Sequence, residues 1–285
     1  MHLGFSSMNT AEDPAPHLLA TTLEQAGFES LWYGEHSHIP VSRRTPYPAG
    51  GELPAPYRKM MDPYTSLMAA AAATTRLKLG TGIALLLERE LFSQAKTIAT
   101  LDRLSGGRLI IGCGVGWNEE EFTNASRLPW NRRYLAMKET VLAQRALFTE
   151  QEPAFHGELI DFDPVWFEPK PLQAGGPPVT FGAMGPLGIR HAAQWADGWM
   201  PVDVGLPDIA GSLADFRRQV AEQGRDPDAL EITLVVMAEV TADLLKRYRD
   251  LGIHRCIIGV GMENWDKPEI VMPMIEQFSR LVPEL

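Results

Sequence analysis

Two histidines and a glutamate stand together just after a short apolar run. Residues Ser30–Gly34 have the composition of a β-strand, and Glu35, His36 and His38 follow them directly. An imidazole accepts or donates a proton near neutral pH, and an adjacent carboxylate can orient its ring. We therefore expect His36 to act in proton transfer, with Glu35 as the neighbour that orients it.

The pair His36-x-His38 also has the spacing of two metal ligands. A catalytic metal centre of this kind needs further histidines at later strand ends and an acid after the last strand. The remaining histidines do not supply them, because His191 falls in a helical stretch, His156 in an expected hairpin and His254 before the last strand. The sequence predicts no metal site.

Glycines alternate after another apolar run. Gly112, Gly114 and Gly116 occupy every second position, and Trp117 follows them. This is not the dinucleotide-binding fingerprint, which would place a glycine where Trp117 stands. Two interpretations stay open: a layer of small residues that lets a barrel pack tightly, or a backbone surface that a flat ligand can approach, with Trp117 as its wall.

A second glycine-rich turn joins a strand to a helix. The turn Gly182–Gly185 follows the apolar run Val179–Gly182 and precedes a helical pattern that starts at Gly188. The N–H groups that begin a helix have no partners inside it and attract anions. The turn therefore either binds an anionic group such as a phosphate or is only a flexible connection.

The elements that must position these residues alternate along the whole chain. Short β-branched or aromatic runs take turns with longer Ala- and Leu-rich amphipathic stretches, a pattern typical of parallel βα units. We expect eight strands, at His2–Ser7, Ser30–Gly34, Leu77–Ile83, Arg108–Cys113, Val179–Gly182, Gly198–Val202, Glu231–Ala238 and Arg255–Val260. We expect eight helices, at Pro14–Ala26, Pro63–Thr75, Leu91–Leu104, Asn131–Phe148, Gly188–Trp195, Pro207–Gln223, Ala242–Leu251 and Pro268–Leu281.

Eight such units close most economically into an α/β fold of the (β/α)8 TIM-barrel type. Two stretches interrupt the rhythm. Residues 35–62 form a long Pro- and Gly-rich loop after the second strand, and a connection of that length is usually functional. Residues 153–173 contain the alternating segment Phe155–Phe162, which predicts a β-hairpin inserted before the fifth strand. We expect one domain over residues 1–285, with its active site at the strand carboxyl ends.

The composition excludes several classes of protein. The chain has 285 residues, with 26 Lys and Arg against 36 Asp and Glu, so its formal net charge is −10. That balance does not suit a protein that neutralises nucleic-acid phosphates. No apolar run approaches the roughly 20 residues that span a bilayer, and the N-terminus lacks the pattern of a signal peptide. With only Cys113 and Cys256 present, we expect a cytoplasmic protein without disulfides.

Four ordered motifs resemble the luciferase-like monooxygenase superfamily, and within it the coenzyme F420-dependent oxidoreductases. They are residues 27–36 (GFESLWYGEH), 75–83 (TRLKLGTGI), 101–117 and 182–199, which span nearly the whole expected barrel. The resemblance implies a (β/α)8 barrel with an insertion, which binds F420, or FMN in other branches, over the strand ends. It also implies a homodimer.

The resemblance implies a role for individual residues as well. It places His36, the catalytic residue, beside the cofactor ring and the substrate, and it implies a non-proline cis peptide between Gly82 and Ile83 behind the ring. The residues that it implies for cofactor binding are Glu35, Gly82, Ile83, Gly114, Val115 and Gly116 near the ring, and Gly182, Ala183, Met184 and Gly185 at the phosphate.

One position departs from the family pattern. F420-dependent sugar-phosphate dehydrogenases carry a catalytic glutamate after the fourth-strand glycines, where this chain has Trp117, and Glu119–Glu121 fall on the next turn. The indole favours an apolar or aromatic substrate over a phosphorylated sugar. We expect the long loop to close over this substrate with Tyr47 and Tyr57, while its arginines Arg43, Arg44 and Arg58 could meet the anionic tail of F420.

The activity expected on these grounds is hydride transfer between F420 and a small organic substrate, with His36 as proton donor or acceptor. An FMN-dependent monooxygenase is the alternative, because the barrel and the phosphate turn serve both cofactors. A non-catalytic flavin-binding barrel is the second alternative.

Overall fold

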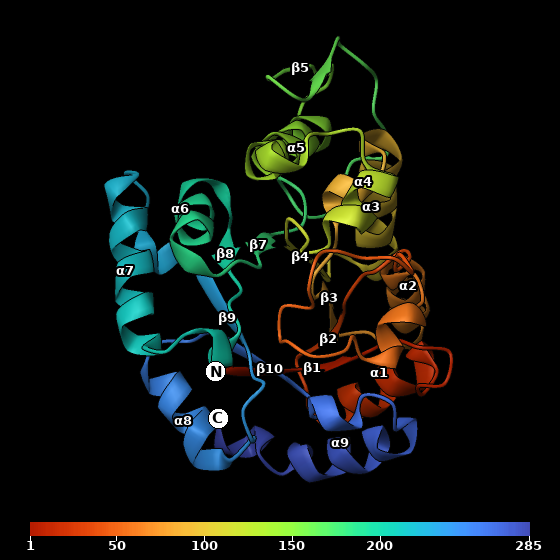
Figure 1. The fold of residues 1–285 in the computed structure, drawn as a ribbon, viewed down its shortest axis with the longest axis vertical. Coiled ribbons are helices and arrows are strands. Elements are labelled where there is room, and N and C mark those ends of the chain that lie inside the picture. Colours follow the sequence, from red (N-terminus) through yellow and green to blue (C-terminus); the bar gives the residue numbers. More distant parts are fainter.

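The computed structural model describes residues 1–285 and contains a closed barrel of eight parallel strands (Figure 1). Around the barrel the order is β1-β10-β9-β8-β7-β4-β3-β2, so each strand lies beside its neighbour in the chain once the hairpin strands are set aside. The expected (β/α)8 barrel is confirmed. The barrel strands are β1 (His2–Ser7), β2 (Ser30–Tyr33), β3 (Lys78–Thr81), β4 (Leu109–Cys113), β7 (Val179–Phe181), β8 (Gly198–Trp199), β9 (Glu231–Val235) and β10 (Arg255–Gly259).

Helices form a ring outside the strands, and the two chain ends meet, since the amino group of Met1 donates to the carbonyl oxygen of Leu285 at 3.2 Å (Figure 1). None of the helices combines the length and the apolar character needed to cross a membrane. They are α1 (Pro16–Gln25), α2 (Pro63–Ala73), α3 (Leu91–Ser105), α4 (Glu119–Ala125), α5 (Arg133–Thr149), α6 (Gly185–Trp195), α7 (Ile209–Glu222), α8 (Ala242–Asp250) and α9 (Val271–Ser279).

The inserted hairpin is present as predicted. Strands β5 (Phe155–His156) and β6 (Asp161–Phe162) pair antiparallel and project beyond α5 in Figure 1. The carboxylate of Glu139 on α5 holds the hairpin turn, because it accepts hydrogen bonds from the three backbone N–H groups of residues 158–160 at 2.7–2.9 Å. A buried acid thus anchors a turn whose backbone donors would otherwise have no partner.

Several element bounds differ from those expected. Helix α6 begins at Gly185 rather than Gly188, since Pro186 fits the first turn of a helix and does not stop it. Strand β9 ends at Val235 and β8 at Trp199, earlier than expected, and beyond β8 only Val202 keeps an isolated bridge to Val235. Helix α4 was not expected as a separate element, although it carries residues of the site.

The barrel interior is filled around one tryptophan. Trp32 on β2 is fully buried, packs with Ile110, Met200 and Ile257, and donates a hydrogen bond from Nε1 to Ser30 Oγ at 2.8 Å. A Cβ at Gly80 on the adjacent strand would lie 2.2 Å from its ring, and one at Gly4 would lie 2.8 Å from Nε1. The two glycines therefore make room for the indole inside the barrel.

A buried ion network closes the opposite end of the barrel from the site. Arg255, at the start of β10, donates to both oxygens of Glu29 at 2.8 Å, to Glu231 at 3.0 Å and to Thr233 at 3.1 Å. Its side chain is 1% exposed. Burial would raise the pKa of Glu29, but the hydrogen bonds and charge of Arg255 outweigh it and lower that pKa to about 2.

Candidate active site

Small, half-exposed residues line the mouth of the barrel where the strands end. They follow four neighbouring strands, β2, β3, β4 and β7, and the peptide bond between two of them, Gly82 and Ile83, is cis, as the resemblance implied. The strand residues below them are buried. This floor leaves backbone accessible to a flat ring, and it consists of Gly34, Gly82, Ile83, Val115, Gly182 and Ala183.

His36 lies above this floor and pairs with an acid from a different part of the chain. Its Nδ1 atom lies 2.7 Å from Oε2 of Glu121 on α4, and the two side chains are 8% and 1% exposed. The side chain of Asn118 caps α4 by accepting a hydrogen bond from Glu121 N at 3.3 Å, which leaves the Glu121 carboxylate free to bind His36. A buried histidine with a carboxylate on Nδ1 can present Nε2 to a substrate.

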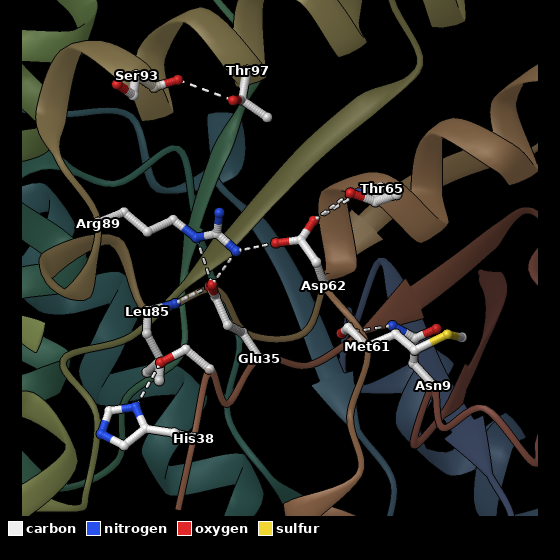
Figure 2. A network of polar contacts seen from close by, with 11 residues as sticks. Asn9, Glu35, His38, Met61, Asp62, Thr65, Leu85, Arg89, Ser93 and Thr97 are labelled. Atoms are coloured by element: carbon white, nitrogen blue, oxygen red, sulfur yellow. Dashed lines mark hydrogen bonds and ion pairs between the residues drawn. The ribbon is translucent and has the colours of Figure 1, made fainter.

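The expected contact between Glu35 and His36 is wrong. Figure 2 shows the buried Glu35 carboxylate turned instead toward Leu85 and Arg89, whose N–H groups donate to it at 2.8 and 2.5 Å. Arg89 also pairs with Asp62, the N-cap residue of α2. Burial raises the pKa of Glu35, although the charge of Arg89 opposes the rise. Glu35 thus links the ends of β2 and β3. Both of its carboxylate oxygens accept hydrogen bonds from other residues of the protein.

Aromatic side chains cover His36. The ring centroids of Tyr57 and Trp117 lie 5.2 and 5.8 Å from that of His36, and Tyr47 lies 5.5 Å from Tyr57 and 5.9 Å from Trp117. Trp265, from the segment after β10, extends the cluster at 5.8 Å from Tyr57. The two loop tyrosines expected over the site therefore meet Trp117 and His36, and the cluster keeps water from the imidazole.

Helix α4 also holds the long loop. Glu120 accepts hydrogen bonds from Arg44 N at 2.8 Å, Thr45 N at 3.4 Å and Thr45 Oγ1 at 2.7 Å. Those hydrogen bonds lower the pKa of Glu120 to about 2. Of the loop arginines expected to meet an anionic tail, Arg44 is thus engaged by Glu120, while Arg43 reaches the carbonyl oxygen of Pro40 at 3.5 Å.

The second histidine of the strand end turns away from the first. His38 Nε2 lies 3.1 Å from Asn124 Nδ2 of α4, and its Nδ1 lies 2.9 Å from Ser37 Oγ. No group of three or more His, Cys, Asp or Glu side chains in the protein is arranged to hold a metal ion.

The alternating glycines serve close packing around Ile83. A Cβ at Gly114 would lie 2.1 Å from Ile83 Cδ1, one at Gly182 would lie 2.7 Å from Ile83 Cγ2, and one at Gly112 would lie 2.0 Å from the backbone oxygen of Thr81. These contacts support the tight-packing interpretation of the glycine run. They also fix Ile83 in the floor of the site.

The glycine turn opens directly into α6. Met184 is the N-cap residue and makes no capping hydrogen bond with its side chain, and Gly185 has φ of 80° with nothing within 4 Å of where a Cβ would stand. The Met184 side chain lies against Gly205, and the methyl group of Ala183 lies against Gly188. The first N–H groups of α6 have no partners inside the helix, so the turn suits an anion.

Sequence reasoning missed Glu121 as the partner of His36, yet a signal for it was present. Asn118 followed three positions later by Glu121 is the spacing of a helix cap, which would have predicted α4 and put Glu121 in its first turn. No local signal pointed to Arg89 and Asp62, because their contact joins the ends of separate elements.

A family model and a curated relative match this chain over most of its length. The model for luciferase-like monooxygenases matches residues 7–269. An uncharacterised protein of Mycobacterium tuberculosis is 35% identical over 265 residues, which are 91% of this chain and 92% of that protein.

Solved structures with low sequence identity share the fold. An F420-dependent secondary alcohol dehydrogenase, solved with an F420–acetone adduct, has a TM-score of 0.74 and 19% identity, covering 99% of this chain and 98% of its own. A monooxygenase of Streptomyces bottropensis has a TM-score of 0.68 and 24% identity, covering 100% and 83%. With the family model matched across the barrel and its insertion, this chain belongs to the luciferase-like monooxygenase family.

Proposed function

We propose that this chain is an F420-dependent oxidoreductase that transfers a hydride between the deazaflavin and a small apolar or aromatic substrate. The observation that carries the proposal is the buried His36–Glu121 pair, which lies under an aromatic cover at the strand ends of the barrel. The fold shared with an F420-dependent secondary alcohol dehydrogenase supports it.

The residues at the barrel mouth fit a cofactor with a flat ring and an anionic tail. The half-exposed floor around Gly82 and Ile83 would accept the face of the ring. The open turn at Gly185 and the first N–H groups of α6 would hold the phosphate of the tail, through hydrogen bonds and the positive end of the helix dipole. When bound, the deazaflavin supplies or takes up the hydride at one carbon of its ring.

In this proposal His36 is the residue that exchanges a proton with the substrate. With Nδ1–H donated to the Glu121 carboxylate, Nε2 is the atom left to exchange a proton with a substrate oxygen. The Glu121 carboxylate holds the ring in one orientation, and the surrounding rings of Tyr57 and Trp117 keep water away from it. Proton transfer by a positioned side chain of this kind contributes about 10²–10⁴-fold to a rate.

The aromatic cover selects the substrate class. The rings of Tyr47, Tyr57 and Trp117 stand within 6 Å of one another or of His36, as centroid distances of 5.2–5.9 Å show. Apart from the tyrosine hydroxyls, which lie 3.3 Å from each other, and the indole N–H of Trp117, these side chains offer apolar surface. A ketone or alcohol with an aromatic or alkyl substituent fits this surface better than a phosphorylated sugar.

A binding experiment separates the two cofactors. The purified protein is titrated with F420 and, separately, with FMN, and absorbance and fluorescence are followed. Saturable binding of F420, then its oxidation or reduction with a panel of aryl and alkyl ketones and alcohols, is the expected result. Saturable binding of FMN without F420 binding would point to the FMN-dependent monooxygenase, and binding without turnover would point to a non-catalytic barrel.

The proposed anion binding at the N-terminus of α6 is tested by introducing a negative charge there. Leu187, in the first turn of α6, is 48% exposed. Leu187→Glu should weaken binding of the anionic cofactor, because it brings a negative charge to the helix N-terminus, whereas Leu187→Gln is a control of equal size without that charge. Equal affinities for both variants would place the cofactor tail elsewhere.

Alanine variants of His36 and His38 form a matched pair whose turnover can be compared. His36→Ala should reduce turnover about a hundredfold or more while leaving the dissociation constant of the cofactor unchanged. His38→Ala removes a neighbouring imidazole that binds Asn124 and should retain turnover. Turnover preserved in His36→Ala would remove His36 from the mechanism.

A further inference from the structure

A third carboxylate borders the His36–Glu121 pair, and the chemistry proposed above does not use it. Glu88 ends a short 3₁₀ turn, Leu86–Glu88, that packs against α4. Its Oε1 atom would lie 3.5 Å from a Cβ at Gly116, just ahead of the Asn118 cap of α4. Its Oε2 atom is buried and has no hydrogen-bond partner.

Glu121 also has one unsatisfied oxygen. While Oε2 contacts His36, Oε1 is buried without any partner, in a side chain that is 1% exposed. A buried carboxylate oxygen without a donor loses its hydration and gains nothing in return, so such atoms are nearly always satisfied. A neutral carboxylic acid on an adjacent element would supply the missing hydrogen, and Glu88 is a buried, unpartnered acid on the turn that packs against α4.

The electrostatics of Glu88 agree with a neutral form. Burial, and after it the negative charges of Glu121 and Glu35, together raise the pKa of Glu88 to about 8. These two are the charged groups that act on Glu88, and the charge of Glu35 is itself paired with Arg89. At neutral pH most molecules therefore carry a protonated Glu88, as expected when neighbouring carboxylates share a site.

We propose that Glu88 is a positioning residue: as a neutral acid it donates its hydrogen to Oε1 of Glu121, directly or through one water molecule, and so fixes the carboxylate that orients His36. The hydrogen bond satisfies both unpartnered oxygens at once. Glu88 makes and breaks no covalent bond in this role. Above about pH 8 its hydrogen bond to Glu121 is lost, because Glu88 then becomes a carboxylate. The role in turnover rests on the proposed function, whereas the hydrogen bond itself does not.

The hydrogen bond is tested in the protein without cofactor. Carbon-13 NMR of labelled glutamate carboxyl groups should show one group that titrates near pH 8, lost in Glu88→Gln and retained in the exposed control Glu119→Gln. The titration midpoint should fall in Glu121→Gln, because the largest neighbouring negative charge is removed. Glutamates that all titrate in the ordinary range would overturn the proposal.

The positioning role has its own readout. The hydrogen-bonded Nδ1–H proton of His36 should be visible by NMR below pH 8 in the wild type, persist above pH 8 in Glu88→Gln, and broaden in Glu88→Ala. The amide of glutamine still donates to Glu121, which alanine cannot do. An identical Nδ1–H signal in the wild type and Glu88→Ala would overturn the role.

Turnover provides the last comparison. In Glu88→Ala it should fall by about tenfold, less than for loss of a group that touches the substrate, and Glu88→Gln should restore it and remove its decline above pH 8. Glu88→Gln behaving like Glu88→Ala would overturn the proposal. Absence of F420 turnover in every protein would refute the proposed function alone, since both NMR readouts are obtained without cofactor.

Discussion

His36 and Glu121 are 85 residues apart in the chain and meet at 2.7 Å, Nδ1 to Oε2, in the interior of the site. Histidine comes from the end of β2 and glutamate from the first turn of α4, which follows β4. Because Glu121 is buried, its charge acts on the imidazole with little screening. The pair therefore links the segments that follow two strands of the barrel.

Replacing Glu121 by Gln should preserve the hydrogen bond to Nδ1 and remove the charge behind it. We expect kcat to fall by about 10–100-fold, the range found for carboxylates that orient metal-binding histidines, with KM and cofactor affinity little changed. Steady-state kinetics of Glu121→Gln beside the exposed control Glu119→Gln measure this. An unchanged kcat would show that the Glu121 charge has no part in turnover.

Loosening the long loop should affect substrate binding before it affects the chemical step. Glu120→Ala removes the acceptor of four loop hydrogen bonds from Arg44 and Thr45. We expect the backbone amides of Arg44 and Thr45 to exchange with solvent about five- to tenfold faster, and KM to rise, while the thermal midpoint stays unchanged.

Hydrogen exchange followed by mass spectrometry measures this change, with Glu119→Ala as the control on the same helix. Exchange equal to that of the wild type would mean that the loop is held by its aromatic contacts alone.

The barrel interior should not tolerate a larger residue at Gly80. The new methyl carbon of Gly80→Ala would lie 2.2 Å from the Trp32 ring, which is itself confined against Gly4. We expect a loss of about 1–3 kcal/mol in the free energy of unfolding, measured with urea. The change should be smaller in a Trp32→Phe background, because the smaller ring leaves room; an equal loss in both backgrounds would contradict this account.

The free energy of unfolding should fall at acid pH, because Glu29 becomes protonated there. Its pKa is lowered to about 2 in the folded protein, because the hydrogen bonds and charge of Arg255 outweigh burial. A carboxyl group with a lowered folded pKa stabilises the protein above its ordinary value, near 4.5, and this contribution disappears as the pH falls toward 2. It amounts to about 3 kcal/mol.

Urea unfolding from pH 7 to pH 2 measures this slope. Glu29→Gln should flatten it below pH 4.5 and lower stability at pH 7 by about 3–5 kcal/mol, since Arg255 loses a buried partner. The exposed variant Glu52→Gln should keep the wild-type slope. An unaltered slope in Glu29→Gln would assign the acid sensitivity to other groups.

Local patterns were sufficient to predict the eight barrel strands and the helices around them except α4. The alternation of short β-branched runs with amphipathic stretches depends only on residues that are neighbours in the chain. The same patterns predicted the barrel, the inserted hairpin and the position of His36 at a strand end. Element bounds were less accurate, as at Gly185, because a glycine and a proline can either start or stop a helix.

The partners of those residues were decided by tertiary structure. Adjacent side chains at the end of a strand point in opposite directions, so Glu35, though next to His36, turns to Arg89, while the imidazole meets Glu121 from another element. Closing of the barrel likewise brought Trp32 against Gly80 and Glu88 beside α4. Sequence determined which chemical groups stand at the strand ends, and packing of distant elements determined which of them share a hydrogen bond.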